Sequence, residues 1–168
     1  MGTSTINEAG AAATKQFCTF HLAGRLYGVN ILDVKEVTTE VAITPIFHAP
    51  AGVKGYVNIR GHVHLVLDLK LLLGFENMVV KESCRVVLLK PHVGDSFGIL
   101  VERIGDVVRV EGDLIQDRRR VAENKGEEFD GHDRRQVSEQ LIKGVCKLEK
   151  SLLVVLEPRN FLRTIEKT

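Results

Sequence analysis

Apolar and polar residues alternate in several short segments of the chain, the pattern of half-buried β-strands. Residues 16–22 (QFCTFHL) alternate, Ala23-Gly24 supplies a turn, and residues 25–31 (RLYGVNI) resume the apolar pattern, so a hairpin is expected. Further strands are expected at residues 53–59, 63–69, 84–90, 95–101 and 105–110. Residues 31–37 combine a helical spacing of apolar side chains with β-branched residues, and the pattern leaves helix or strand open there.

Helices are expected to be short. Residues 68–74 (DLKLLLG) begin with Asp68, a good N-cap residue, and end with Gly74, which suits the left-handed position after a helix. Residues 44–52 hold two of the four prolines and do not alternate, so they are expected to form a loop. Strands therefore outnumber helices, which predicts a β-barrel or β-sandwich class.

The chain repeats itself in two blocks. Residues 27–37 match residues 97–107 at an offset of 70, and residues 53–73 match residues 142–162 at an offset of 89. The order of the blocks is the same in each half, and a Lys-Gly pair, Lys54-Gly55 and Lys143-Gly144, precedes the third strand each time. Half-domains of this size bury too little surface to be stable alone, so the two halves are expected to pack together with a groove between them.

Composition and charge narrow the class of protein. Of the 168 residues, 44% are hydrophobic and 27% charged, and the formal net charge is +1, so broad phosphate binding is disfavoured. Aromatic residues make up only 5%, with no Trp, which argues against a small-barrel module that stacks on nucleic acid bases. Three widely spaced cysteines are read as reduced thiols. We find neither a secretory signal nor an apolar run long enough to span a bilayer, which predicts a cytoplasmic protein without membrane insertion.

Candidate chemistry is sparse, and the expectation is that the chain is not an enzyme and needs no cofactor. His62 and His64 are two residues apart, so a strand would place both on one face, and with Asp68 they define an alternative, a metal-dependent enzyme. The favoured interpretation is two polar residues on the wet face of a strand, with Asp68 as a helix cap and no metal site. The sequence contains no P-loop, no nucleophile elbow and no dinucleotide-binding glycine motif.

Taken in order, several motifs resemble the CheW-like domain of bacterial chemotaxis coupling proteins. These are YGVNILDVKEV (27–37), APAGVKGYVNIRGHVHLVLDL (49–69), VERIGDV (101–107) and IKGV (142–145), and the similarity covers about residues 16–165. The resemblance implies two five-stranded SH3-like barrels packed around a shared core. Residues 1–15 are small and polar and are expected to be a disordered tail, which leaves residues 16–168 for the domain, with intertwined halves of roughly 25–83 and 84–162. Residues 111–140 are highly charged and are expected to form a surface loop.

The resemblance also implies a function and a binding surface. The implied function is an adaptor that couples the cytoplasmic signalling tips of chemoreceptors to the regulatory domain of a sensor histidine kinase and modulates that kinase. Such a protein would be a monomer when free, would associate with receptor arrays at the inner membrane and would not bind nucleic acid. The implied receptor- and kinase-binding residues are Val34, Glu36, Lys54, Asn58, Arg60 and Gly61, with Gly55, Asp68 and Gly144 in structural roles.

Overall fold

The computed structural model describes residues 13–117 and 139–166 of the chain. The first twelve residues of the predicted tail, and residues 118–138 of the predicted charged loop, lie outside the described residues. The predicted tail extends too far, to residue 15, because the first strand already begins at Thr14. The described ends of the charged segment also hold regular structure, including a short strand at Ile115–Asp117.

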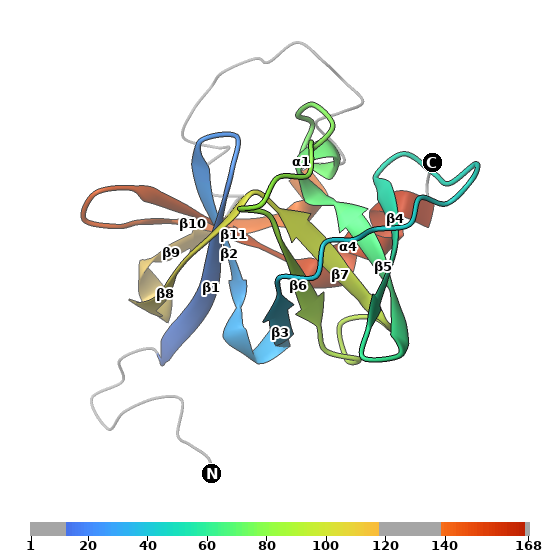
Figure 1. Ribbon diagram of the computed structural model, residues 1–168. Coiled ribbons are helices and arrows are strands. Elements are labelled where there is room, and N and C mark those ends of the chain that lie inside the picture. The colour runs from blue at the N-terminus through green and yellow to red at the C-terminus, as the bar shows by residue number, and fades with distance from the viewer. Residues whose placement is uncertain (1–12, 118–138, 167–168) are drawn as a thin grey trace.

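The described part of the chain is mainly β-structure with short helical segments (Figure 1). The strands are β1 (Thr14–Leu22), β2 (Arg25–Asn30), β3 (Val34–Thr38), β4 (Val53–Ile59), β5 (His62–Asp68), β6 (Arg85–Leu89), β7 (Phe97–Val101), β8 (Arg103–Glu111), β9 (Ile115–Asp117), β10 (Ile142–Lys147) and β11 (Leu152–Leu156). The helical segments are η1 (Ile31–Asp33), α1 (Leu69–Leu72), η2 (Gly112–Leu114), η3 (Pro158–Asn160) and α4 (Phe161–Glu166). The segment whose pattern left helix or strand open is thus a single 3₁₀ turn followed by a strand.

These strands form two sheets. One has six strands in the order β8-β1-β2-β11-β10-β9, and the other has five in the order β3-β6-β7-β5-β4. The prediction of a mainly β fold in two units with short helices is confirmed, but one unit has a sixth strand, β9. The first repeat has no full strand at the corresponding place, where Thr44 forms a single bridge with Tyr56.

The register of the strands confirms the internal repeat. Replacing each strand by its repeat partner turns the order β3-β6-β7-β5-β4 into β8-β1-β2-β11-β10, which is the order of the six-stranded sheet without β9. The two parallel pairs agree residue by residue, since Val66 lies opposite Gly98 and Val155 lies opposite Gly28. Both sheets are built from both halves of the sequence, because β1 and β2 join β8–β11 while β3–β5 join β6 and β7.

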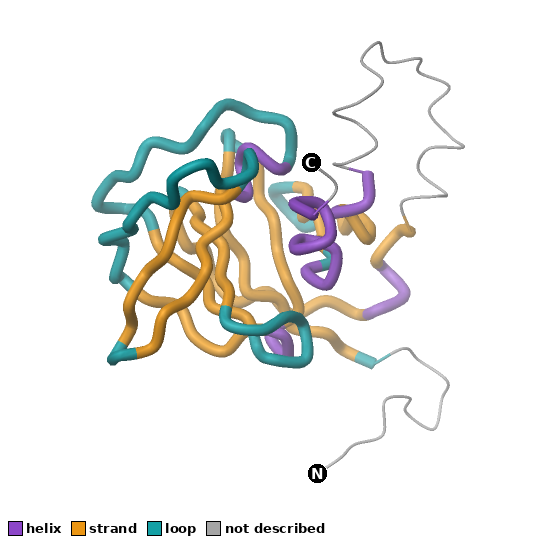
Figure 2. Tube along the Cα trace, turned by 90° about the vertical axis from the view of Figure 1, so that its right-hand side faces the viewer, coloured by secondary structure: helices purple, strands orange, loops and turns teal. Residues whose placement is uncertain are grey.

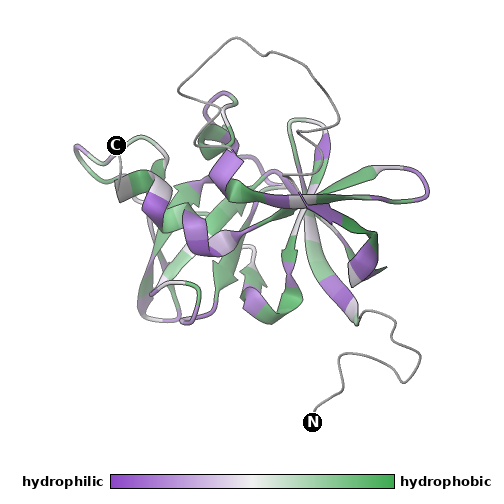
Figure 3. Ribbon diagram, turned by 180° about the vertical axis from the view of Figure 1, so that it is seen from behind, coloured by the Kyte–Doolittle hydropathy of each residue, from purple (hydrophilic) through white to green (hydrophobic). Residues whose placement is uncertain are grey.

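A continuous hydrophobic core joins the two sheets. The six-stranded sheet contributes Phe20 and Val29, the five-stranded sheet contributes Val66 and Ile99, and all four side chains are fully buried. A second, smaller cluster of buried apolar residues surrounds Phe17 and is formed by strands of the six-stranded sheet alone. In Figure 3 hydrophobic residues recur along the strands, and the tip of the β10–β11 hairpin is hydrophilic. The burial of apolar surface from both sheets in one core explains why neither sheet has to be stable alone.

The short helices close the ends of the sheets, as the tube view shows (Figure 2). Asp68 is the N-cap of α1, because its Oδ1 accepts a hydrogen bond from the amide of Leu71 at 3.0 Å. At the matching place in the second repeat, Glu157 caps η3 and Pro158 occupies its first turn. Among the helices within the described ranges, none has the length and apolar character needed to cross a lipid bilayer.

Gly55 and Gly144 occupy matching positions at which each sheet bends. The strand register shifts beside both residues, a sign of a β-bulge, and Gly55 has a φ of +148°. A Cβ atom at Gly55 would lie 2.1 Å from the carbonyl oxygen of Thr44, and one at Gly144 would lie 2.5 Å from that of Gln116. Any side chain would therefore push a backbone segment away from the sheet.

We expect Gly55→Ala to lower the free energy of unfolding by about 2–4 kcal/mol, because it combines a backbone clash with a positive φ. Urea denaturation followed by circular dichroism measures this loss. Gly61→Ala is the matched control, since Gly61 also has a positive φ of +86° but its Cβ would meet open space. The control should lose only about 1 kcal/mol, and an equal loss in both variants would contradict the assignment of the clash.

Candidate functional site

The β4–β5 hairpin ends in a two-residue turn formed by Arg60 and Gly61. Both residues have positive φ, +50° and +86°, as in the turns that match the twist of two paired strands. The side-chain oxygen of Asn58 accepts a hydrogen bond from the Gly61 amide at 2.9 Å, which holds the turn together. A left-handed conformation costs an arginine roughly 1–2 kcal/mol, which asparagine or glycine would largely avoid. The conformation of the turn therefore does not explain why this residue is an arginine.

The Arg60 guanidinium reaches Glu36 of β3 at 2.5 Å. Because β3 and β4 are the two edge strands of the five-stranded sheet, this ion pair lies where the sheet curls back upon itself. The Arg60 side chain is 72% exposed and the Glu36 side chain 28% exposed. An ion pair this exposed contributes at most about 1 kcal/mol to stability, so both groups remain available to a partner.

His64 is buried near this ion pair. Burial is the largest cause that lowers the pKa of His64, the positive charge of Lys35 and the neighbouring His62 lower it further, and the carboxylate of Glu36 opposes them. The expectation that His62 and His64 both lie on a wet strand face was wrong for His64, which is 7% exposed, whereas His62 is exposed. Burial along β5 rises from the exposed His62 and Val63 to the buried Val66, Leu67 and Asp68 instead of alternating, which the sequence pattern does not reveal.

Lys54 and Val34 do not join the hairpin site. Lys54 lies six residues before Arg60, at the far end of β4, and its amine donates a hydrogen bond to the carbonyl oxygen of Met78 at 2.5 Å. Val34 is half-buried and packs against the core. The structure therefore brings together Glu36, Asn58, Arg60 and Gly61 of the six residues expected to bind partners.

Asp68 has a structural environment. Its side chain is 1% exposed, its Oδ1 caps α1, and its Oδ2 accepts a hydrogen bond from the amide of Met78 at 2.8 Å. It lies four positions after His64 along β5, about 13 Å at 3.3 Å per residue. Within the described ranges, no three His, Cys, Asp or Glu side chains are placed to hold a metal ion. The geometry thus gives no basis for a centre made of His62, His64 and Asp68.

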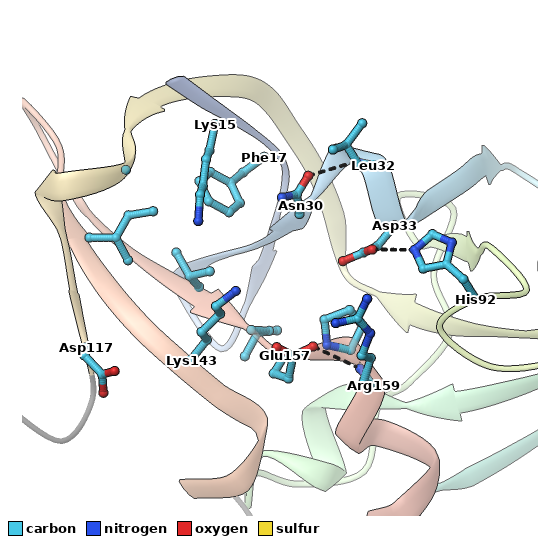
Figure 4. A pocket seen from close by; sticks show the side chains of 15 residues that line it. Lys15, Phe17, Asn30, Leu32, Asp33, His92, Asp117, Lys143, Glu157 and Arg159 are labelled. Carbon is cyan, nitrogen blue, oxygen red and sulfur yellow. Dashed lines mark hydrogen bonds and ion pairs between the residues drawn. The ribbon is translucent and has the colours of Figure 1, made fainter. Parts of the chain in front are cut away.

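A second candidate site, which the sequence did not reveal, is a pocket of about 470 Å³ at one end of the six-stranded sheet (Figure 4). Its apolar lining includes Phe17, Leu32 and Pro158. Charged groups of both signs surround it, among them Lys15, Lys143, Arg159, Asp33 and Glu157. His92 also lines it and lies 2.8 Å from the Asp33 carboxylate. These residues come from segments up to 144 positions apart, which is why no local motif marked the pocket.

The fold and the hairpin define a class of protein: a duplicated β domain in which two small sheets share a core and a charged turn projects at one edge. Comparison with known families identifies it further. The family model of the CheW-like domain matches residues 16–166, almost the whole chain. The chain therefore belongs to the CheW-like domain family, and the resemblance found in the motifs is confirmed.

Individual relatives agree with this assignment. The chain is 28% identical over 145 residues to the chemotaxis protein CheW of Treponema pallidum, covering 84% of this chain and 78% of that protein. It is 28% identical over 117 residues to the chemotaxis protein CheW of Klebsiella aerogenes, covering 68% and 69%. The crystal structure of the scaffolding protein TtCheW from Thermoanaerobacter tengcongensis has the same fold, with a TM-score of 0.70, 23% identity and coverage of 88% and 91%.

Family membership also answers the question of catalysis. Proteins of the CheW family are scaffolds, so the prediction that this chain is not an enzyme is confirmed. The metal-dependent enzyme considered for His62, His64 and Asp68 is accordingly set aside. The exposed guanidinium of Arg60 presents several hydrogen-bond donors in a planar fork, a geometry that suits carboxylate and carbonyl groups.

The buried His64 should make stability depend on pH. Its pKa is lowered in the folded chain, so the unfolded chain binds the proton more readily, and stability is full above the ordinary value of about 6.5 and falls as pH drops below it. His64→Gln should remove this part of the pH dependence in urea titrations between about pH 7.5 and 5. His48→Asn is the matched control, because it removes an exposed histidine that does not contribute to the lowered pKa of His64, and it should keep the wild-type slope. Identical slopes in all three proteins would refute the assignment.

Proposed function

We propose that this chain is a chemotaxis adaptor that binds the cytoplasmic signalling tips of chemoreceptors and the regulatory domain of the chemotaxis histidine kinase. The observation that carries the proposal is the family match over residues 16–166, together with relatives that are named chemotaxis proteins. In this proposal the protein acts in the cytoplasm at receptor arrays on the inner membrane. It has no chemical step, and it biases the kinase between active and inactive states by holding it in a fixed geometry.

The hairpin surface supports the proposal as a place where a partner is recognised. Arg60 is held on a preformed turn, so binding orders little additional backbone. Its partner Glu36 holds the guanidinium in place at the edge of the sheet. A protein partner with a carboxylate or with free carbonyl groups can share these donors, and it can add apolar contact through the half-exposed Val37 and Val63.

The two sheets offer different surfaces at matching positions. In the second repeat, Asp106 corresponds to Glu36 and Glu149 corresponds to Arg60. The second unit therefore carries two acidic groups where the first carries an ion pair. A single partner chemistry cannot satisfy both surfaces equally well. This difference supports an adaptor that binds two unlike proteins at once.

We expect Arg60→Glu to weaken binding to a receptor signalling-tip fragment or to the kinase regulatory domain by at least about tenfold, because it reverses the charge at the turn. Pull-down and calorimetry with fragments from the organism of origin measure this change, and a ternary complex of the three components tests the function as a whole. Lys81→Glu, a charge reversal at an exposed residue outside both of these surfaces, is the matched control and should leave binding unchanged.

A charge swap separates recognition from support of the fold. The double variant Glu36→Arg/Arg60→Glu keeps an ion pair between β3 and the hairpin but exchanges its sign. If Arg60 contacts the partner, the swap restores stability without restoring affinity. Recovery of full affinity in the swapped protein, or unchanged affinity in Arg60→Glu, would argue that the hairpin does not bind partners, and the absence of any ternary complex would overturn the adaptor proposal.

A further inference from the structure

In the first repeat, the loop between α1 and β6 places Met78 between two charged side chains. The Met78 amide donates a hydrogen bond to Oδ2 of Asp68 at 2.8 Å, and the Met78 carbonyl oxygen accepts one from the Lys54 amine at 2.5 Å. Met78 is 2% exposed, and its side chain packs in the hydrophobic core. One carboxylate and one amine thus hold both polar backbone groups of a single apolar residue.

The second repeat places the equivalent charged side chains at the pocket of about 470 Å³ described above. The Lys-Gly pairs make Lys143 the counterpart of Lys54, and the register of the parallel strands makes Glu157 the counterpart of Asp68. Oε1 of Glu157 accepts a hydrogen bond from the Arg159 amide at 3.4 Å, as Oδ1 of Asp68 does from an amide of α1. Among the described residues, no group donates to Oε2 of Glu157, which corresponds to the carboxylate oxygen that is occupied in the first repeat.

The pocket corresponds to the place that Met78 fills in the first repeat, and the part of the chain that the structure describes leaves it open. Its lining is partly apolar, with Phe17 on β1 and Val155 on β11. A volume of about 470 Å³ lies within the range of roughly 300–1,000 Å³ that is typical of small-molecule sites. A ligand that takes the place of Met78 therefore needs a hydrogen-bond donor, an oxygen acceptor and an apolar side chain.

The pocket carries more positive charge than its counterpart in the first repeat. The register of β1 and β6 places Lys15 where the uncharged Cys84 stands in the first repeat. Arg159 corresponds to Lys70, whose amine lies 3.2 Å from the carboxylate of Glu102. Within the described ranges, no carboxylate forms an ion pair with Lys15 or Arg159. These two cations therefore remain available to an anionic ligand.

The side chains around the pocket favour a carboxylate as the acceptor group of the ligand (Figure 4). The amines of Lys15 and Lys143 point toward each other at one side of the pocket, so a single anionic group between them can accept a hydrogen bond from each. A carboxylate forms stronger hydrogen bonds with amines than the neutral carbonyl of a peptide group does. Asp33 lies 2.8 Å from His92, and Asp117 has an interaction of its own, so neither carboxylate is free to neutralise the two amines.

We propose that this pocket binds a free L-α-amino acid with a medium-sized apolar side chain. The carboxylate of the ligand accepts hydrogen bonds from Lys15 and Lys143, and its ammonium group donates to Oε2 of Glu157. Its side chain lies against the apolar lining of the pocket. The ligand thus repeats, with full charges, the three contacts that Met78 makes in the first repeat. This inference does not rest on the proposed function.

Isothermal titration calorimetry of the full chain with L-methionine, whose side chain is that of Met78, tests the proposal. We expect saturable binding with a Kd between about 10 μM and about 1 mM. Lys143→Gln should raise the Kd at least about tenfold, because it removes a charged hydrogen-bond donor, and Glu157→Gln should do the same while keeping an oxygen for the helix cap. Lys147→Gln, an exposed lysine of the same strand outside the pocket lining, is the matched control and should bind as the wild type does.

Three related probes test the groups of the ligand one at a time. L-Methioninamide lacks the carboxylate, N-acetyl-L-methionine lacks the ammonium charge, and glycine lacks the apolar side chain. Each should bind at least about tenfold more weakly than L-methionine. Inorganic phosphate at the same concentration should not displace L-methionine, because it offers neither an ammonium group nor an apolar side chain.

Four outcomes would overturn the proposal. The absence of saturable binding up to about 10 mM would exclude an amino-acid site, and unchanged affinity in Lys143→Gln would place the ligand elsewhere. Tighter binding of N-acetyl-L-methionine would assign the pocket to the C-terminal residue of a peptide, and displacement by phosphate would make it an anion site only. Lys143 is exposed, so its substitution leaves the fold intact, which circular dichroism checks. Because only this chain and the probe are present, the result is independent of whether receptor and kinase bind.

Discussion

Two parallel strand contacts hold this domain together, one between β2 and β11 and the other between β5 and β7. Each contact joins a strand of the first repeat to a strand of the second, and each places a glycine opposite a valine. On its other side Gly98 faces β6, where a Cβ atom would lie 2.8 Å from the carbonyl oxygen of Val87, so the close antiparallel approach of β6 to β7 requires glycine. The remaining strand pairs are antiparallel and mostly local hairpins. The two repeats thus share both a hydrophobic core and hydrogen-bonded ladders, since each sheet contains strands of both repeats.

Much of this architecture could be predicted because a repeat and a strand pattern are local properties of a sequence. The hairpins, the short helix after Asp68 and the two-unit design follow from alternation, turn residues and capping. The sixth strand could not be predicted, because Ile115–Asp117 is short, sits in a highly charged segment and is defined by pairing with β10. The burial of His64 was missed for a related reason, since strand alternation describes a flat sheet and this sheet curls.

The candidate site could likewise be predicted only in part. Motif order pointed to Glu36, Asn58, Arg60 and Gly61, and these residues meet because the hairpin tip reaches across to the opposite edge strand. The same motif suggested Lys54, whose amine is instead engaged with the loop after α1. The pocket had no local signature at all, since a cavity depends on distant segments.

The assignment of strands to sheets also has a consequence for biosynthesis. All five strands of one sheet lie in a continuous stretch from Val34 to Val101. In the other sheet β1 pairs with β8, which ends at Glu111, whereas β2 must wait for β11, which pairs Leu26 with Leu153. At ribosomal speeds of about 5–20 residues per second, that delay lasts roughly 6–25 s. During this time the β2 edge of the nascent N-terminal hairpin has no native partner strand, so its backbone groups are open to pairing with strands of other chains until β11 emerges.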